Sequence, residues 1–392
     1  MKILLVSHRL PFPPDRGGRI RQYQILRHLG RDHDVTLASP LRTDDVAAHV
    51  DALRPFARRL ILAPVSELRS WLQATLALPT ATPSSFAYFH SAQLARSVRC
   101  ELSDGYDVVL VHCSAMAPYV APTGAVTIAD IVDVDSEKWL EYGRQRRFPE
   151  SFGFWLEGRK VRRAEAAIVS RFDLCTCATP EELEVLPASG EVGWFRNGVD
   201  AEYFRPSSEP ADPGSICFIG HMDYYPNRDA MLWFCETVWP QLRAEHPGAT
   251  LSIIGADPTA DIRRLGERPG IRVTGHVADV RPYLWRSALS VAPLRVARGT
   301  QNKILESLAM GVPVVASPLA ARGTDTIAGE HLLVASEPRD VVAAISRLLS
   351  DPGERQRLAV AGRQRMLTHH DWHNSMRRLD ALIDGCLARR NR

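Results

Sequence analysis

The chain has 392 residues, of which 45% are hydrophobic and 24% are charged, a composition typical of a water-soluble globular protein with two domains. The formal net charge of +3 argues against binding to nucleic acid through a strong overall positive charge. The seven scattered cysteines argue against a disulfide framework. The apolar run at residues 3–6 is too short for a signal peptide, and no segment is long enough to cross a bilayer, so we expect a cytoplasmic protein.

Short apolar strands alternate with amphipathic helices in the first half of the chain. Strands are predicted at residues 3–6, 35–37, 107–111, 126–129 and 174–178, and a helix is predicted from about residue 19 to residue 30. This alternation predicts an α/β fold with a doubly wound parallel sheet. Such sheets bind ligands at loops that follow their strands, and the candidates here are the loop at 11–18 and the strand end at His112.

The second half of the chain repeats the same alternation. Strands are predicted at residues 215–219, 250–254, 271–273, 288–292 and 312–315, with helices at 229–245 and 372–386. The turn at 197–200 and the Pro- and Ser-rich segment at 206–214 predict an exposed connection between two domains. We expect domains at residues 1–197 and 198–371, and a last helix at 372–392 that packs back toward the first domain.

The stretch at residues 298–317 carries the clearest chemical signal. A loop with Gly299 leads into a helix whose opening turns contain Lys303 and Glu306. A helix N-terminus presents unpaired N–H groups and suits a phosphate, and Lys303 adds a full positive charge. Glu306 can accept two hydrogen bonds from a vicinal diol such as a ribose. These features indicate a nucleotide-sugar site, although an ordinary loop–helix–strand unit with a surface lysine and glutamate fits the same residues.

The order and spacing of several motifs resemble the retaining GT-B glycosyltransferases of family 4 (group 1). The resemblance covers nearly the whole chain and rests on segments 11–18, 106–112, 197–200, 218–220, 253–255, 273–277 and 306–315. More narrowly, residues 133–139 and 299–303 resemble the sugar transferases of bacterial exopolysaccharide and exosortase (PEP-CTERM) systems.

The resemblance implies a GT-B fold, with two Rossmann-like doubly wound parallel-sheet domains that face a central cleft. It implies glycosyl transfer from a nucleoside-diphosphate sugar, UDP- or GDP-linked, to a glycan or a polyprenyl-diphosphate-linked acceptor in exopolysaccharide or cell-surface glycan synthesis. The N-terminal domain would bind the acceptor and the C-terminal domain the donor. No cofactor and no metal ion are implied, and such enzymes are described as attacking from the front face of the sugar.

The resemblance also implies roles for individual residues. The catalytic candidates are His112, Lys303 and Glu306. The donor diphosphate would be bound by Gly17, Gly18, Gly220, Arg295, Arg298, Gly299, Thr300, Gln301 and Asn302. The nucleoside would be bound by Val277 and Glu306, and Asp133 and Lys138 are acceptor-side candidates.

The chain departs from the family pattern at two places. Arg298 stands where many members have the first of two glutamates. Residues 221–228, where many members place an Arg and a Lys, read His-Met-Asp-Tyr-Tyr-Pro-Asn-Arg, so the basic pair is missing at its usual place. Arg295, Arg298 and Lys303 are the available substitutes for that basic pair.

An acidic group and two basic stretches allow more than one interpretation. Asp133, Asp135 and Glu137 have spacing that fits a metal site or a double-displacement nucleophile, but the resemblance implies neither, and we interpret Asp135 as a helix cap. Residues 141–171 contain eight basic and four acidic residues with interleaved aromatics. This stretch and residues 54–71 predict either peripheral contact with the inner face of the cytoplasmic membrane or exposed helices with aromatics in the core.

Two other functions fit parts of the sequence, and a third is disfavoured. A nucleotide-sugar epimerase of GT-B fold would act on the donor without an acceptor, and a non-catalytic sugar-nucleotide-binding module would need no catalytic residue. An NAD-dependent enzyme is disfavoured because no G-x-G-x-x-G motif follows the first strand.

Overall fold

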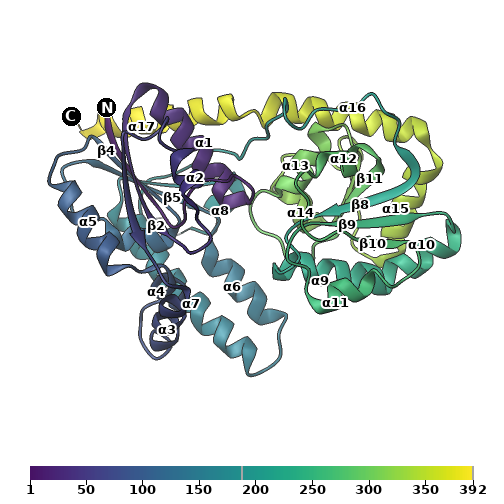
Figure 1. The fold of residues 1–392 in the computed structure, drawn as a ribbon, viewed down its shortest axis with the longest axis horizontal. Helices are drawn as coiled ribbons and strands as arrows, with labels where there is room; N and C mark the ends of the chain where they lie inside the picture. The colour runs from purple at the N-terminus through teal and green to yellow at the C-terminus, as the bar shows by residue number, and fades with distance from the viewer. Residues whose placement is uncertain (187–188, 391–392) are drawn as a thin grey trace. The chain divides into compact units, whose positions relative to one another are not determined.

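The computed structural model describes residues 1–186 and 189–390. Its internal contacts divide the chain into two compact units, whose helices and strands are labelled in Figure 1. Unit 1 comprises Met1–Arg196 and Met376–Arg392, and unit 2 comprises Asn197–Ser375. In the part of the chain that the structure describes, no helix has both the length and the hydropathy needed to cross a bilayer.

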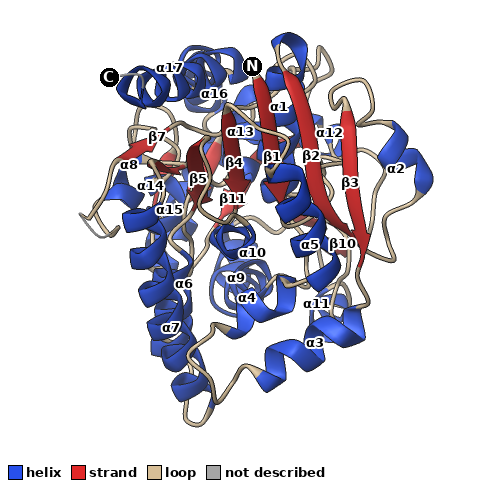
Figure 2. Ribbon diagram, turned by 90° about the vertical axis from the view of Figure 1, so that its left-hand side faces the viewer, coloured by secondary structure: helices blue, strands red, loops and turns tan. Residues whose placement is uncertain are grey.

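Unit 1 is built on a seven-stranded parallel sheet with the strand order β3-β2-β1-β4-β5-β6-β7. The strands are β1 (Lys2–Ser7), β2 (Asp34–Leu41), β3 (Arg59–Pro64), β4 (Val108–His112), β5 (Val126–Val132), β6 (Leu174–Cys177) and β7 (Val192–Trp194). Figure 2 shows them in red among the helices. The strand order reverses between β1 and β4, where Ser7 pairs with His112, and this switch point is where a doubly wound sheet leaves space for a ligand.

The helices of unit 1 connect and cover these strands. They are α1 (Gly17–Asp32), α2 (Ala47–Asp51), α3 (Glu67–Leu76), α4 (Ser84–Phe89), α5 (Ala92–Leu102), η1 (Ser114–Tyr119), α6 (Asp135–Arg144), α7 (Glu150–Arg171) and α8 (Pro180–Leu183), with most of α17 (Trp372–Arg390). In α17, Asp380 accepts a hydrogen bond from His28 at 2.9 Å and Arg378 donates to the carbonyl of Trp194 at 2.5 Å. The basic–apolar stretch at 54–71 is not one surface helix, because residues 59–64 pair with β2 as the edge strand β3.

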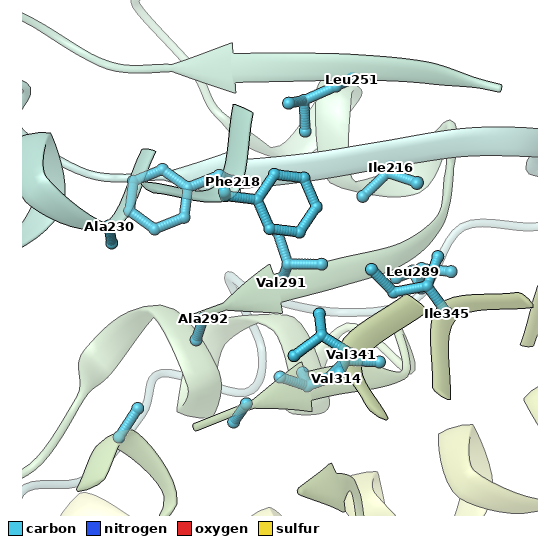
Figure 3. Packing of buried hydrophobic residues seen from close by; sticks show 14 of the residues in the cluster. Ile216, Phe218, Ala230, Leu251, Leu289, Val291, Ala292, Val314, Val341 and Ile345 are labelled. Atoms are coloured by element: carbon cyan, nitrogen blue, oxygen red, sulfur yellow. The ribbon is translucent and has the colours of Figure 1, made fainter. Parts of the chain in front are cut away.

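Unit 2 is built on a six-stranded parallel sheet with the order β10-β9-β8-β11-β12-β13. The strands are β8 (Asp212–Ile219), β9 (Thr250–Ile254), β10 (Ile271–Val273), β11 (Ser287–Ala292), β12 (Val314–Ala316) and β13 (Leu333–Val334). Figure 3 shows how apolar side chains of β8, β9, β11, β12 and α15 (Pro338–Ser350) gather into one core. The order reverses between β8 and β11, so unit 2 has its own switch point at the carboxyl ends of these strands.

The other helices of unit 2 are α9 (Tyr225–Trp233), the π-helix η2 (Phe234–Val238), α10 (Trp239–Glu245), α11 (Ala260–Leu265), α12 (Arg281–Trp285), α13 (Asn302–Ala309), α14 (Pro318–Arg322) and α16 (Pro352–His369). The helix expected at 229–245 contains a π-helical turn. Its physical cause is Pro240, which has no N–H to donate to the carbonyl one turn earlier. The prediction of two α/β units with parallel sheets is confirmed.

Candidate functional site

At the switch point of unit 2, the loops after β8 and β9 approach each other so closely that only glycine fits at the contact. Gly220 follows β8 and Gly255 follows β9, and a Cβ atom added to Gly255 would lie 1.8 Å from the carbonyl oxygen of Gly220. Gly255 also has a φ of +144°, which L-residues rarely adopt. A Cβ added to Gly220 would lie 2.5 Å from Nδ2 of Asn227. The glycines therefore bring the two loops and Asn227 into direct contact.

Lys303, on the first turn of α13, is held at this switch point by two contacts. Its Nζ donates a hydrogen bond to Oδ1 of the buried Asn227 at 2.5 Å and lies 4.3 Å from the ring centroid of Phe218 on β8. Asn227 in turn donates to the carbonyl of His221 at 2.9 Å. The ammonium is thus fixed beside the carboxyl end of β8. Asn227 was not predicted as a site residue, and it lies within the stretch that lacks the family's basic pair.

The charges of Lys303 and Glu306 are both disfavoured by their surroundings. Burial lowers the pKa of Lys303 to about 7, and the nearby Glu306 only partly opposes this effect. Burial likewise raises the pKa of Glu306 to about 7, against the influence of Lys303. Lys303 is also the only lysine among residues 197–375. An anion bound beside Lys303 would favour its charged form, so the site is electrostatically incomplete without one.

The loop before α13 leaves polar groups without partners. Gly299 has a φ of +59°, and the side chain of the N-cap residue Gln301 makes no hydrogen bond to the first turn. Thr300 Oγ1 and Asn302 Oδ1 are buried without a hydrogen-bond partner anywhere in the described parts of the chain. Gln301 instead donates to the carbonyl of Arg298 at 2.9 Å. Since buried polar groups are normally hydrogen-bonded, this loop has unused capacity for a ligand.

The other residues predicted for the donor lie around the same sheet edge. Arg295 follows β11 and forms a bidentate ion pair with Asp229 of α9, at 2.9 and 2.5 Å, so its charge is already balanced. Val277 follows β10 and packs beside the apolar cluster that contains Ile219 and Ile254. The structure thus gathers Gly220, Val277 and the 295–306 segment at the carboxyl ends of β8, β9, β10 and β11. Their roles stay predictions.

One group with metal-ligand geometry also lies at these strand ends. His221, Asp223 and Asp257 each offer a ligand atom, and the three atoms lie within 4.8 Å of one another. His221 Nδ1 lies 3.7 Å from Asp257 Oδ2, which a simple surface ion pair explains equally well.

In unit 1, His112 belongs to a buried ionic network at the end of β4. Its Nδ1 lies 2.8 Å from Oδ2 of Asp130, and Arg21 contacts both carboxylate oxygens of Asp130 at 2.8 Å. Thr176 donates to the same carboxylate at 2.9 Å, and Arg21 lies 3.5 Å from the ring centroid of Phe195. Despite its burial, the pKa of Asp130 is held well below its usual range by Arg21 and His112. The ionised Asp130 therefore accepts a hydrogen bond from Nδ1–H of His112 and leaves Nε2 for another partner.

His8 joins His112 to the predicted glycine pair. The rings of His8 and His112 stack at 5.8 Å, and a Cβ added to Gly18 would lie 3.9 Å from Cε1 of His8. Burial, followed by the influence of His112, lowers the pKa of His8 well below its usual value. Gly17 and Gly18 form the first turn of α1, whose N-cap residue Arg16 makes no side-chain cap. The pair therefore exposes helix N–H groups near His112, although a loop was expected there.

Asp133 lies after β5 in a strained turn. Val132 has a φ of +71°, which is rare for a β-branched residue, and the N–H of Asp133 donates to the carbonyl of Ile131 at 3.0 Å. Burial, followed by the charge of Glu182, raises the pKa of Asp133 to about 7, and its Oδ1 has no hydrogen-bond partner among the described residues. Asp133 thus has a free acceptor atom.

The interpretation of Asp135 as a helix cap is wrong. Val134 is the N-cap residue of α6, and Asp135 lies inside the first turn. The N–H groups of Val134 and Ser136 donate instead to the buried carboxylates of Glu182 and Glu165, at 2.8 and 3.2 Å. Because these long-range partners satisfy the helix start, no local cap is needed. Lys138 lies one turn farther along, with its Nζ 3.7 Å from Asp135 Oδ1.

Comparison with known proteins gives this geometry a context. Residues 213–351 match the family model described as Glycosyl transferases group 1. Over 242 residues the chain is 31% identical to a glycogen synthase of Mycobacterium tuberculosis, which corresponds to 56% of this chain and 56% of that relative. The chain thus spans little more than half the length of this curated relative.

Solved structures match over almost the whole chain. Sucrose-phosphate synthase from Thermosynechococcus elongatus superposes with a TM-score of 0.75 and 17% identity, covering 99% of both chains. Anabaena HepE in complex with UDP superposes with a TM-score of 0.70 and 13% identity, covering 98% of this chain and 100% of that chain. Together these matches show that the whole chain has the two-domain fold of these glycosyltransferases, and that residues 213–351 are similar to the group 1 glycosyltransferases.

Proposed function

We propose that the protein is a retaining glycosyltransferase that moves a sugar from a nucleoside-diphosphate sugar to a glycan or polyprenyl-linked acceptor in exopolysaccharide or cell-surface glycan synthesis. The observation that carries this proposal is the state of the Gly299–Lys303 segment. Its buried Thr300 and Asn302 oxygens lack partners, and its lysine has a pKa lowered to about 7. A bound diphosphate would supply a counter-charge for Lys303. A proton on the diphosphate, or a water beside it, would donate hydrogen bonds to the Thr300 and Asn302 oxygens.

The reaction needs positive charge where the leaving group becomes negative. As the glycosidic bond to the diphosphate breaks, charge grows on the departing phosphate oxygen, and oriented donors lower the barrier. Lys303 and the free N–H groups at the start of α13 would supply that stabilisation, with Arg295 and Arg298 as further contacts. Gly17 and Gly18 would add backbone N–H groups of α1. Glu306, when ionised, would accept hydrogen bonds from the ribose, and Val277 would pack against the base.

His112 would position the sugar rather than attack it. Its Nδ1 is occupied by Asp130, so Nε2 is the nitrogen that can bind a sugar hydroxyl. Asp130 itself accepts four short contacts, from Arg21, His112 and Thr176, which leaves it poorly suited to act as a nucleophile. These contacts favour front-face transfer over a covalent intermediate. Asp133 and Lys138 would contact the acceptor.

Exposed aromatics of unit 1 support peripheral contact with an anionic membrane surface. In the stretch at 141–171, Phe154 packs against Trp139 and Tyr142, whereas Phe152 and Trp155 are exposed, as is the neighbouring Phe148. Of the three interleaved aromatics Phe152, Phe154 and Trp155, only Phe154 is partly buried, so the expectation that they lie in the core is wrong for Phe152 and Trp155. Exposed aromatic rings beside arginines are typical of surfaces that bind membranes.

The proposal is tested by measuring binding and turnover of nucleotide sugars. We expect UDP and at least one UDP-sugar to raise the melting temperature of the protein. The structure of HepE, which has a similar fold, was solved in complex with UDP-glucose. GDP-sugars serve as the comparison. Conversion of the donor without any acceptor would indicate an epimerase, and binding without turnover on any acceptor would indicate a binding module. The anomeric configuration of the product, read by NMR, tests retention.

Metal dependence is tested in the same assay. We expect activity to persist in excess chelator, because Lys303 and the start of α13 supply the positive charge. Loss of activity that Mg²⁺ or Mn²⁺ restores would instead give the His221, Asp223 and Asp257 group a role.

A further inference from the structure

Unit 1 contains a cavity of about 570 Å³ that none of the roles above uses. It lies between the carboxyl ends of β2 and β3 and the start of α5, with α3 along one side. Figure 2 shows these elements close together in the same unit. Its walls include the apolar side chains of Leu41, Val65 and Ala92, and three arginines, Arg42, Arg69 and Arg96, line it. We refer to it as the arginine pocket.

The three arginines have no carboxylate partner among residues 1–186 and 189–390. The Arg42 guanidinium donates to the hydroxyl of Tyr88 at 3.1 Å, while its buried Nε has no hydrogen-bond partner in the described structure. Burial and the charge of Arg42 lower the pKa of the neighbouring Arg9. Asp45 accepts only the backbone N–H of Arg42, at 2.9 Å, and Arg69 and Arg96 are exposed. The side chains of all three arginines are thus available to attract an anion into the pocket.

The start of α5 adds to the positive potential of the pocket. Ala92 and Gln93, the first residues of this 11-residue helix, are among those that line the cavity. The side chain of the N-cap residue Ser91 accepts the N–H of Leu94, so the N–H groups nearer the helix start remain available to a ligand. A bound phosphate would thus meet both guanidinium groups and helix N–H groups.

Two series of ring contacts extend from Arg42, one toward His112 and one toward α3. On one side, Arg42 lies 5.6 Å from the ring of Phe89, and Phe89 lies 5.2 Å from His8, the ring that stacks on His112. On the other side, Arg42 lies 4.9 Å from the ring of Tyr88, which packs at 5.2 Å against Trp71 of α3. Ring contacts therefore connect Arg42, at the pocket, with His112 in one direction and with α3 in the other.

The outer face of α3 is apolar and exposed. Leu68 and Leu76 are 72% and 73% exposed, and Trp71 and Leu72 are more than half exposed. A soluble protein rarely presents four large apolar side chains on one short helix without a partner. Because this face adjoins a pocket of unpaired arginines, its partner should combine an anionic head with a hydrocarbon chain.

We infer that the arginine pocket binds the phosphate or diphosphate group of a lipid-linked acceptor, whose hydrocarbon chain lies along α3. This inference rests on the proposed function and assigns the acceptor's charged group to Arg42, Arg69 and Arg96. Arg42 lies near His112, separated from it by the rings of Phe89 and His8, so an acceptor anchored at the pocket could extend its sugar toward His112.

The experiment measures binding of farnesyl diphosphate to the full chain by calorimetry, with UDP at saturation so that diphosphate sites in unit 2 are filled. Arg42→Gln and Arg96→Gln should each weaken binding about tenfold, the loss typical of one charge-assisted hydrogen bond. The matched control is Arg99→Gln, which removes an exposed arginine from the same helix outside the pocket and should leave the affinity unchanged.

Further arms identify the part of the ligand that is recognised. Inorganic pyrophosphate and farnesol should both bind at least tenfold more weakly than farnesyl diphosphate, and Trp71→Ser should weaken only the farnesyl ligand. Equal affinity for pyrophosphate would overturn the role of α3, and unchanged affinity in an Arg42→Gln, Arg69→Gln, Arg96→Gln triple variant would overturn the pocket itself. If UDP binds while farnesyl diphosphate does not, this inference alone fails; if no nucleotide binds, the proposed function fails.

Discussion

Replacing Lys303 by glutamine separates a ligand-binding role from a structural one. Glutamine keeps an N–H donor for Asn227 but removes the charge. At about 1.4 kcal/mol per pH unit, moving the pKa from 10.5 to about 7 sets an upper bound of roughly 5 kcal/mol on the cost of protonating Lys303 in the folded state. The lysine tip keeps some contact with water and with Asn227, so the true cost lies below this bound.

The sign of this effect follows from the direction of the pKa shift. The pKa is lower in the folded state, so between pH 7 and pH 10.5 the unfolded chain binds the proton more strongly and the folded state loses stability as the pH falls. The Lys303→Gln protein should therefore be at least as stable as the wild type at pH 7.5. Its affinity for UDP should fall about 10- to 100-fold, because one charge-assisted contact with the diphosphate is lost.

Calorimetry with UDP and thermal unfolding of the free protein measure the two effects separately. Arg264→Gln is the control, because it removes one positive charge from an exposed position of α11 in the same unit. A melting temperature several degrees lower, together with unchanged UDP affinity, would show that Lys303 only holds α13 against β8 and would refute the reasoning.

The remaining predictions concern neighbouring groups. UDP affinity should peak near pH 7, because Lys303 loses its proton above about pH 7 and Glu306 gains a proton below it. Calorimetry from pH 5.5 to 9 measures this profile. Glu306→Gln should remove the decline in affinity on the acid side. Asp130→Asn leaves Arg21 buried without a full charge partner and should lower the free energy of unfolding by about 3–5 kcal/mol in urea titrations; a loss below about 1 kcal/mol would contradict the network's importance. Gly255→Ala should lower stability by about 1–3 kcal/mol and weaken UDP binding, whereas Gly248→Ala, with open space around its Cβ, should do neither.

The sequence predicts the central strands well, but it predicts only β10 of the four edge strands. The predicted strands at 250–254 and 271–273 coincide with β9 and β10, and each is followed shortly by a glycine. Strands β3 and β7 were not predicted, nor was the two-residue edge strand β13. β3 is a half-exposed edge strand with charged Arg59 at its start, and β7 has three residues, so neither shows the continuous apolar run of a central parallel strand.

The candidate site was predictable where its chemistry is local. Gly299, Lys303 and Glu306 lie within eight residues of one another, so the sequence alone predicts a loop followed by the start of a helix with these side chains. Asn227 acts on Lys303 across 76 residues, and Arg21 acts on Asp130 across 109 residues. An arginine on an amphipathic helix is usually a surface residue, and nothing near Arg21 in the sequence indicates that a distant aspartate keeps it buried.

The two switch points have the same topology, but the buried polar groups are hydrogen-bonded in unit 1 and partly without partners in unit 2. This difference suggests different functions for the two switch points. In unit 1 the Asp130 carboxylate is satisfied by Arg21, His112 and Thr176, so the network is complete and holds His112 in one orientation. In unit 2 the oxygens of Thr300 and Asn302 lack partners, and burial works against the charge of Lys303. A complete network gains little from an added anion, whereas an incomplete one gains hydrogen bonds and a counter-charge. We therefore expect the diphosphate of the donor to bind to unit 2 and the ordered His112 of unit 1 to position a sugar.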